Sequence, residues 1–482
     1  MILIVTGACS SDPPEEPKWT APPARLVSLS HDGKLGNERS SVPYPPLAAV
    51  VTADGRFVAF ESKADNLVPD DTSRSHEFQE IFVRDMRRRT TERINVSSSG
   101  NQADQGARAG DDYYLVFPDT DLGGISDDGR YVVFATTSSN LVPDDTNRAW
   151  DVFVRDRHAG TTKRISVASD GAEGNEDSFS PVISGNGKVV AFTSGASNLI
   201  QDDANRHPDV FVHYIATGET VRVSMSSTGE EARMSKGAYS SDGSALPSIS
   251  SDGAFVAFSS SAYNLVEHDT NGVEDVFVRD IDGGETRRVS ISSEGAQTEP
   301  IEVEGELYGE SSNVSLSGDG SVVMFTTSAS NLVAGDTNEL PDTFVHDMKT
   351  DKTERVSVSS DGGQVTGCTN DECDDGSTGG SISFDGRLVA FTSSGNLGAR
   401  DSEYGIEHDV YIRDRATDRT ILANHRYTGA PAGFWNLHGP SLSTNGRWLV
   451  FGADDPRIVR KTRGTETFGW VFLQKLPTSL FD

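Results

Sequence analysis

A nine-residue pattern that recurs seven times is the feature that most constrains the fold of this chain of 482 residues. One copy reads Ser-Asp-Asp-Gly-Arg-Tyr-Val-Val-Phe, and equivalent glycines follow one another at intervals of about 65 residues. Self-similarity at a fixed period indicates an architecture in which each repeat is one small structural unit. The copies begin at Thr52, Ser126, Ser184, Ser250, Ser317, Ser383 and Ser443.

Each repeat is predicted to form four short strands. In the fourth repeat the first strand covers Leu246–Ser250, and an Asp-Gly turn connects it to the alternating strand Phe255–Phe258. A loop rich in Asn, Asp and Thr leads to a third strand at Asp275–Val278, and the fourth covers Arg288–Ser292. Serine at alternate positions of this last strand indicates an outer strand with one solvent-facing side. Such units predict an all-β fold, a seven-bladed β-propeller of four-stranded antiparallel blades.

The two ends of the repeat region complement each other. A strand of the fourth type occurs at residues 25–30, before any other strand, whereas the last repeat ends after a strand of the third type at Trp470–Leu473. We therefore expect the N-terminal strand to complete the last blade and to close the ring, which removes free strand edges. The propeller would then span residues 25–482.

The glycine-turn pattern resembles the repeats of TolB-type β-propellers, which are related to the WD-repeat family, over about residues 25–482. This resemblance implies the blade geometry and a partner in the cell envelope. TolB-type proteins have a second domain that we do not find in this sequence, so their specific function does not transfer.

Residues 1–9 resemble the end of a bacterial lipoprotein signal peptide, in which Cys9 would carry the lipid. Thr6 stands where leucine is usual, and no basic residues precede the apolar stretch, as in a truncated signal segment. Residues 10–24, rich in Pro and Glu, are predicted to form an extended tether. These features predict a lipoprotein of the outer membrane, periplasm or cell surface. The alternatives are a secreted protein and an N-terminus in which Cys9 has no role.

Acidic residues outnumber basic ones by 73 to 42, which gives a formal net charge of −31. This balance argues against nucleic acid and anionic membrane surfaces as ligands, because phosphate binding needs clustered lysine and arginine. Long loops on one rim of a rigid scaffold often carry binding. We expect an envelope protein or a polysaccharide to bind the acidic loop rim of a monomer. This rim includes Asp111, Asp112, Glu299–Glu310 and Asp371–Asp375.

The loop between the second and third strands repeats Asn-Leu-Val-x-x-Asp-Thr-Asn-x-x-x-Asp. Its oxygens at positions 1, 3 and 7 resemble part of the aspartate-rich calcium loops of other propellers, and Ca²⁺ takes about six to eight oxygen ligands. The alternative is structural, because Asp and Asn often bind loop backbone amides, and Pro143 stands where the first calcium carboxylate is usual. The candidate metal ligands are Asp145, Asn147, Asp151, Asp203, Asn205, Asp209, Asp269, Asn271, Asp275, Asp336, Asn338 and Asp342.

Cys368 and Cys373 lie in one loop rich in Gly and Asp. They are close enough in sequence to form a disulfide in an oxidising compartment. A zinc site is the alternative, although no second ligand pair with zinc-finger spacing is present.

Motifs of hydrolases, zinc proteases and nucleotide-binding loops are absent from the sequence. Five histidines near the third strands are expected to pack in loops or blades: His207, His213, His268, His346 and His408. One aromatic cluster could stack on a sugar or pack within its loop: Phe434, Trp435 and His438. We therefore expect a binding or scaffold module. The alternative is a lyase or hydrolase that acts on a polysaccharide at the acidic rim.

Overall fold

The structure is a computed structural model. It describes residues 24–40, 49–69, 71, 79–104, 120–234, 243–303, 306–365, 376–394, 397, 409–424, 438–453, 458, 469–477 and 480, with the backbone alone at 301–303, 306–308 and 438. Within these residues, no helix has the length and apolar character needed to cross a membrane.

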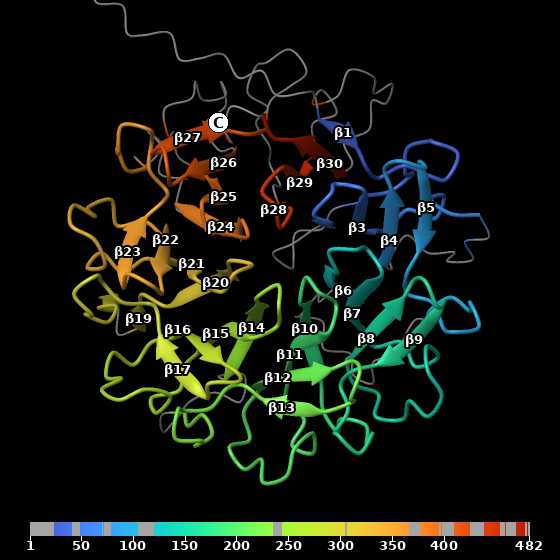
Figure 1. Ribbon diagram of the computed structural model, residues 1–482, viewed down its shortest axis with the longest axis horizontal. Coiled ribbons are helices and arrows are strands. Elements are labelled where there is room, and N and C mark those ends of the chain that lie inside the picture. The colour runs from blue at the N-terminus through green and yellow to red at the C-terminus, as the bar shows by residue number, and fades with distance from the viewer. Residues whose placement is uncertain are drawn as a thin grey trace, which may run out of the picture.

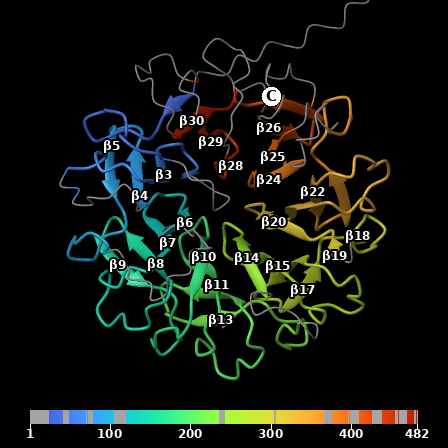
Figure 2. The same ribbon diagram turned by 180° about the vertical axis from the view of Figure 1, so that it is seen from behind.

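The described strands form seven four-stranded antiparallel sheets that follow one another around a centre, as both views of the ribbon show (Figures 1 and 2). This arrangement confirms the predicted seven-bladed β-propeller. Blades 1 to 3 consist of β2 (Ala49–Val51), β3 (Phe57–Ser62), β4 (Glu80–Asp85) and β5 (Thr90–Arg93); β6 (Thr120–Ile125), β7 (Tyr131–Thr136), β8 (Asp151–Asp156) and β9 (Thr161–Arg164); and β10 (Ser178–Ile183), β11 (Val189–Ser194), β12 (Asp209–Tyr214) and β13 (Thr220–Arg222).

Blades 4 to 6 continue this order along the chain. They consist of β14 (Ser244–Ile249), β15 (Phe255–Ser260), β16 (Asp275–Asp280) and β17 (Glu285–Arg288); β20 (Ser311–Leu316), β21 (Val322–Thr327), β22 (Asp342–Asp347) and β23 (Lys352–Arg355); and β24 (Ser377–Ile382), β25 (Leu388–Ser393), β26 (Asp409–Asp414) and β27 (Arg419–Leu422). A separate hairpin between blades 4 and 5 pairs β18 (Ile301–Val303) with β19 (Glu306–Tyr308).

Blade 7 contains both ends of the ring, as predicted. Its strands are β28 (His438–Leu442), β29 (Trp448–Ala453), β30 (Trp470–Lys475) and β1 (Arg25–Leu26). β1 pairs antiparallel with β30, so that Arg25 lies opposite Leu473. The ladder is shorter than the predicted strand 25–30, but the amide of Val27 still donates to the carbonyl of Val471 at 2.8 Å.

Stacked aromatic rings form the centre of every blade. Phe258 in β15 lies directly opposite Phe277 in β16, and their ring centroids are 5.9 Å apart. The other blades repeat this pair, with Tyr411 in place of phenylalanine in blade 6. Apolar residues of neighbouring blades pack against these pairs, so the core lies between blades and the low hydrophobic content of 35% is sufficient.

The outer strands differ from the prediction. β17 ends at Arg288, and the chain then turns, with the amide of Gly295 donating to the carbonyl of Ser292 at 3.0 Å. Ser290 is completely buried, so the prediction of solvent-facing serines on a strand Arg288–Ser292 was wrong. The physical reason is a buried hydrogen bond: the hydroxyl of Ser290 donates to Asp275 Oδ1 at 2.5 Å.

Candidate functional site

The aspartates predicted to bind calcium converge in the structure on an arginine of the outer strand. In blade 5, Arg355 Nη1 lies 2.9 Å from Asp336 Oδ1 and 3.1 Å from Asp342 Oδ2. It also donates to Gln364 Oε1 at 3.1 Å. The amide nitrogen of Asn338 donates to Asp342 Oδ2 at 3.3 Å, so the asparagine presents a donor to the carboxylate. We call this arrangement an arginine latch.

Arginine latches occur in five consecutive blades. In blades 2 to 5, one arginine binds acidic or amide side chains from the loop before the third strand and from the segment after the outer strand. In blade 1, Arg93 pairs with Asp71 and Glu80, and Gln102 of the segment after the outer strand donates to Glu80 Oε1 at 2.8 Å. The central residues are Arg93, Arg164, Arg222, Arg288 and Arg355. In blade 6 the equivalent position is Leu422, and there Asn424 donates to Asp409 Oδ1 at 2.6 Å.

A buried serine completes the latch on its inner side. In blade 5 the hydroxyl of Ser357 donates to Asp342 Oδ1 at 2.5 Å and accepts the amide of Thr343 at 3.1 Å. Both oxygens of Asp342 therefore have partners, although the residue has no exposed surface. Burial nevertheless raises the pKa of the outer carboxyls Asp145, Asp269 and Asp336 to about 6, because it outweighs the neighbouring arginine.

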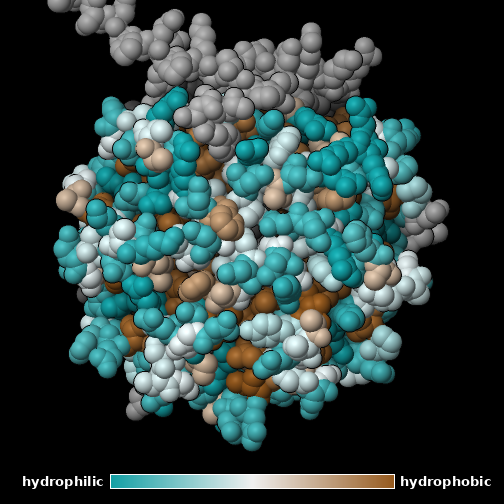
Figure 3. Space-filling model, viewed as in Figure 1, coloured by the Kyte–Doolittle hydropathy of each residue, from teal (hydrophilic) through white to brown (hydrophobic). Residues whose placement is uncertain are grey.

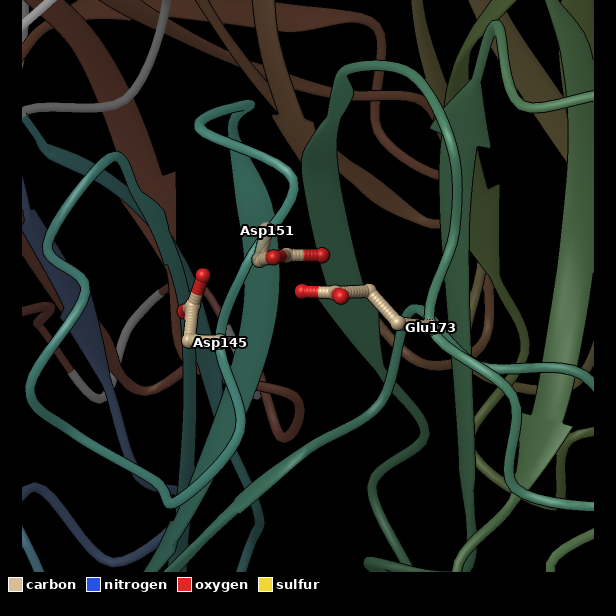
Figure 4. Close-up of side chains that lie close together, drawn as sticks. All are labelled: Asp145, Asp151 and Glu173. Carbon is tan, nitrogen blue, oxygen red and sulfur yellow. The ribbon is translucent and has the colours of Figure 1, made fainter.

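The blade 2 latch contains a cluster of three carboxylates of the kind that can hold a metal ion. One oxygen each of Asp145, Asp151 and Glu173 lie within 4.8 Å of one another, and Figure 4 shows these carboxylates brought together from two loops and the start of β8. Arg164 Nη1 contacts all three, at 3.6 Å from Asp145, 3.1 Å from Asp151 and closer still to Glu173. The guanidinium supplies the positive charge that the sequence pattern suggested for Ca²⁺. These contacts favour the structural alternative, and calcium binding stays a prediction.

Sequence reasoning missed the arginine and the Glu or Gln of each latch. The signal is present, since in blades 2 to 5 the arginine follows the second aspartate by 13 residues and precedes the Glu or Gln by 9. These intervals become visible only when the repeats are compared with one another.

Several predicted sites lie outside the described residues: Cys9, Cys368, Cys373, Asp111, Asp112, Asp371–Asp375, His408, Phe434 and Trp435, as do the segments 1–9 and 10–23. Two of the predicted packing histidines are buried. Nδ1 of His213 lies 2.9 Å from the Thr220 hydroxyl, and His346 repeats this contact with Thr353. Burial lowers the pKa of His213 to about 4, which keeps the ring neutral within the blade.

The turns between the first two strands of the blades meet around the propeller axis, on the face opposite the arginine latches. Each turn has a framework of Ser or Thr, Asp or Asn, and Gly, and the second residue of the pattern lies at its tip. In blade 4, Ser250 donates to Asp252 at 2.7 Å and accepts the amide of Phe255 at 3.0 Å. Gly253 has a φ of +80°, which favours glycine. The seven tip residues are Ala53, Asp127, Gly185, Ser251, Gly318, Phe384 and Thr444.

Hydrogen bonds connect six of these turns around the axis. Backbone bonds of 2.8–2.9 Å run in chain order from Asp127 in blade 2 to Thr444 in blade 7. The hydroxyl of Thr444 then donates to Asp127 Oδ1 at 2.5 Å, which closes the circuit. Within the described residues, no such bond reaches Ala53 of blade 1.

A hollow of about 310 Å³ lies among the tips. Its lining consists of Ala53, Asp127, Phe384, Asp385, Thr444 and Asn445. The ring of Phe384 is 46% exposed, although most large hydrophobic residues of the described chain are buried. We call this the axial hollow. The sequence alone does not single out the axial hollow, because its residues come from positions that differ between the repeats.

Two carboxyl groups interact where blades 1 and 2 meet, Glu61 and Asp121, of which Glu61 is completely buried. Glu61, completely buried in β3, accepts the amide of Leu122 at 2.8 Å and a contact from Gln79 Nε2. Asp121 in β6 accepts the amide of Ser180 at 2.9 Å. Burial raises the pKa of Glu61 well above its usual value, with a further contribution from Asp121. Burial raises the pKa of Asp121 to about 6. At the equivalent point in blade 5, Thr326 makes the bond to the next blade without a charge.

No known protein family matches the sequence, and no curated protein is similar to it. Solved structures with a similar fold include TolB from Acinetobacter baumannii, at 16% identity and a TM-score of 0.37, over 90% of this chain and 86% of that one. The β-propeller domain of the Trilobed protease from Pyrococcus furiosus has 12% identity and a TM-score of 0.48, over 91% and 96% of the two chains. The WD40 repeats of RRP9 have 10% identity and a TM-score of 0.46, over 95% and 100%.

Proposed function

We propose that this chain is a non-catalytic binding module of the cell envelope, whose partner is a protein that docks at the axial hollow. Export and a lipid on Cys9 belong to the proposal and rest on the sequence pattern around that cysteine. The observation that carries the proposal is the contrast within the seven axial turns. Their framework residues are nearly constant, whereas the tip residues differ in size, charge and polarity. Binding residues are commonly carried by variable loop positions on a rigid scaffold.

The lining of the axial hollow indicates the chemistry of the partner. An exposed aromatic ring attracts cations to its face and also anchors apolar groups. Asp127 and Asp385 lie beside Phe384 in the lining, and no basic residue belongs to it. Lysine or arginine side chains of a partner segment match this combination of ring and carboxylates. The net charge of −31 adds long-range attraction for such a basic segment.

The acidic loop rim is the weaker candidate surface. The five arginine latches neutralise many of its carboxylates and hold them in place. The side of the molecule seen in the space-filling view is mostly hydrophilic, with hydrophobic residues in separate patches (Figure 3).

The proposal is tested by screening the purified chain against arrays of lysine- and arginine-containing peptides and of bacterial polysaccharides. We expect peptide binding, and we expect Phe384→Ser to weaken it at least about tenfold. Tyr263→Ser is the matched control, because Tyr263 is also exposed, at 49%, but follows β15 on the opposite face. Loss of binding in Tyr263→Ser alone would place the partner on the loop rim and contradict the proposed surface.

The alternative function is that of a lyase or hydrolase with its site on the acidic rim. Incubation with polygalacturonate and alginate, followed by measurement of new reducing ends, tests for it directly. Turnover by the purified chain would contradict the non-catalytic proposal. Polysaccharide binding without turnover would keep the binding module and change its partner.

A further inference from the structure

A cavity of about 640 Å³ lies where the ring closes, between β1 of blade 7 and the turn that joins β4 to β5 in blade 1. Four arginines contribute to its lining: Arg25, Arg84, Arg88 and Arg89. This concentration of positive charge is unexpected in a chain with a net charge of −31. We call it the seam cavity.

No carboxylate of the residues that the structure describes forms an ion pair with Arg25, Arg84, Arg88 or Arg89. Arg84 is buried and donates to the carbonyls of Leu29 and Ser30, at 3.0 and 2.8 Å. Arg25 donates to the carbonyl of Met86 at 3.0 Å. The guanidinium groups of Arg88 and Arg89 form no hydrogen bond or ion pair with any other residue that the structure describes.

One carboxylate does belong to the lining, but it already has a partner. Asp32 lies 2.6 Å from the ammonium of Lys34 and accepts the hydroxyl of Ser30 at 2.5 Å. The positive charges also act on one another: after burial, Arg89 and Arg25 are the causes that lower the pKa of Arg84. An additional negative charge in the cavity would relieve this repulsion.

The equivalent positions between blades 4 and 5 show what is missing at the seam. There Arg287, two residues before the buried Val289, pairs with Asp351 in the next blade at 2.5 Å. At the seam, Arg25 has the same place relative to the buried Val27. Arg89 has the position in blade 1 that Asp351 has in blade 5. Arg25 and Arg89 therefore place two cations where the interface between blades 4 and 5 has an ion pair. Two further interfaces also join their blades by opposite charges, Glu92 with Arg157 and Glu354 with Arg415.

The backbone at Arg89 is left-handed, as it is at the same point of the turn in blades 2 to 6, where Asp351 of blade 5 and Asp418 of blade 6 have φ values of +54°. The φ of Arg89 is +62°, in the left-handed region that is costly for a side chain of this size. Blades 2, 3 and 4 have Gly160, Gly218 and Gly284 at this point of the turn, with φ values of +67°, +76° and +69°. The charge distinguishes the seam from the other turns: an arginine that faces another arginine is unfavourable in the empty cavity and is stabilised when an anion lies between the two.

We propose that the seam cavity binds a small oxyanion with two or more negative charges, carried by phosphate or carboxylate groups, which bridges Arg25 and Arg89. Guanidinium groups bind both kinds of oxyanion through paired hydrogen bonds. The bound anion would connect blade 7 to blade 1 in the way that Asp351 connects blade 5 to blade 4. Occupancy of the cavity would thereby control how firmly the ring is closed.

Thermal unfolding of the full chain tests this proposal, with sodium pyrophosphate and sodium citrate as separate probes. Each is compared with sodium chloride at equal ionic strength, with EDTA in every sample to remove effects of metal chelation. We expect at least one probe to raise the Tm by about 2–4 °C. A rise with pyrophosphate alone identifies phosphate, and a rise with citrate alone identifies carboxylate, as the bound chemistry.

Two variants make the test specific. Arg89→Asp should form an ion pair with Arg25, raise the Tm without any anion and abolish the response to the probes. Arg87→Gln is the matched control, because Arg87 lies in the same turn but pairs with Asp54 at 2.9 Å outside the cavity, and it should respond as the natural chain does. An equal rise of the Tm in the natural chain and in Arg89→Asp, or no rise in either, would overturn the proposal.

Discussion

Arg288 Nη1 lies 3.1 Å from Asp275 Oδ2, and the aspartate that it contacts has no exposed surface. Asp269, at 3.2 Å, and Gln297, at 3.0 Å, complete the latch of blade 4. A guanidinium therefore organises the loop between the second and third strands and the segment after the outer strand at the same time. Because four other blades repeat this relationship, the latches connect the long loops of blades 1 to 5 to their own blades.

Replacement of the latch arginine should strongly destabilise the blade. Arg288→Met leaves Asp275 buried without a cationic partner, a change that costs about 3–5 kcal/mol in the free energy of unfolding. Denaturant unfolding followed by intrinsic fluorescence measures it. Arg287→Ala is the control, since this neighbouring arginine pairs with the 63% exposed side chain of Asp351 and its loss should cost at most about 1 kcal/mol. Equal effects of the two variants would contradict the latch.

Calcium removal should leave the natural chain unchanged if the arginines supply the positive charge of the latches. We expect the same Tm in EDTA and in millimolar CaCl₂. A calcium-dependent rise of several degrees would instead support the predicted metal sites. Magnesium is the control for ionic strength, because it prefers a smaller octahedral site with bound water.

Glu61→Gln should stabilise the protein at alkaline pH. A carboxyl group whose pKa is raised by folding keeps its proton in the folded chain at pH values where the unfolded chain has lost it, so its contribution to stability falls as the pH rises through the folded pKa. The contribution of Asp121 to stability stops falling above about pH 6, and that of Glu61 continues to fall at higher pH. Glutamine retains an acceptor for the amide of Leu122 and adds a donor for Gln79 Oε1, which lacks a partner.

We expect Glu61→Gln to exceed the natural chain by about 1–3 kcal/mol at pH 8 and to lose most of this advantage at pH 5. Unfolding measured across this pH range checks the prediction. Glu285→Gln, which changes an exposed residue of β17, serves as the control and should track the natural chain. An advantage of Glu61→Gln that does not vary with pH would show that the charge of Glu61 is not its cause.

Disruption of the closing strand should open the ring. Val27→Asp places a carboxylate at a position with no exposed surface, in the cluster that also contains Val471 and Leu473. We expect a marked loss of Tm, an increased radius of gyration in small-angle scattering and rapid proteolysis between blades 7 and 1. Deletion of residues 25–30 should have the same effect. Unchanged unfolding of either variant would contradict closure by β1.

The fold could be predicted from the sequence because its determinants are local. Each repeat contains its own turn, as at Asp252–Gly253, and its own alternating strand, as at Phe255–Phe258. The serines were misread for a related reason. Alternation at Ser290 and Ser292 is also produced by a chain that turns inward, and only the position of Asp275 beneath Ser290 distinguishes the two cases.

The candidate sites depend on contacts between segments that are distant in sequence. Thr444 contacts Asp127 across 317 residues, and no spacing rule connects them. Arg25 and Arg89 come together only because the first strand completes the last blade. The arginine latches are an intermediate case. The interval between Asp275 and Arg288 recurs in the other repeats, so a comparison of the repeats predicts it.

The circuit of hydrogen bonds among the axial turns has a mechanical consequence. It includes blades 2 to 7, and within the described residues it passes by Ala53 of blade 1. Blade 1 also borders the short ladder of β1 and β30, where only Arg25 and Leu26 pair in register. A pulling force on the ring would therefore concentrate on blade 1, which would separate before its neighbours. Under tension the ring would therefore open at one defined place, blade 1.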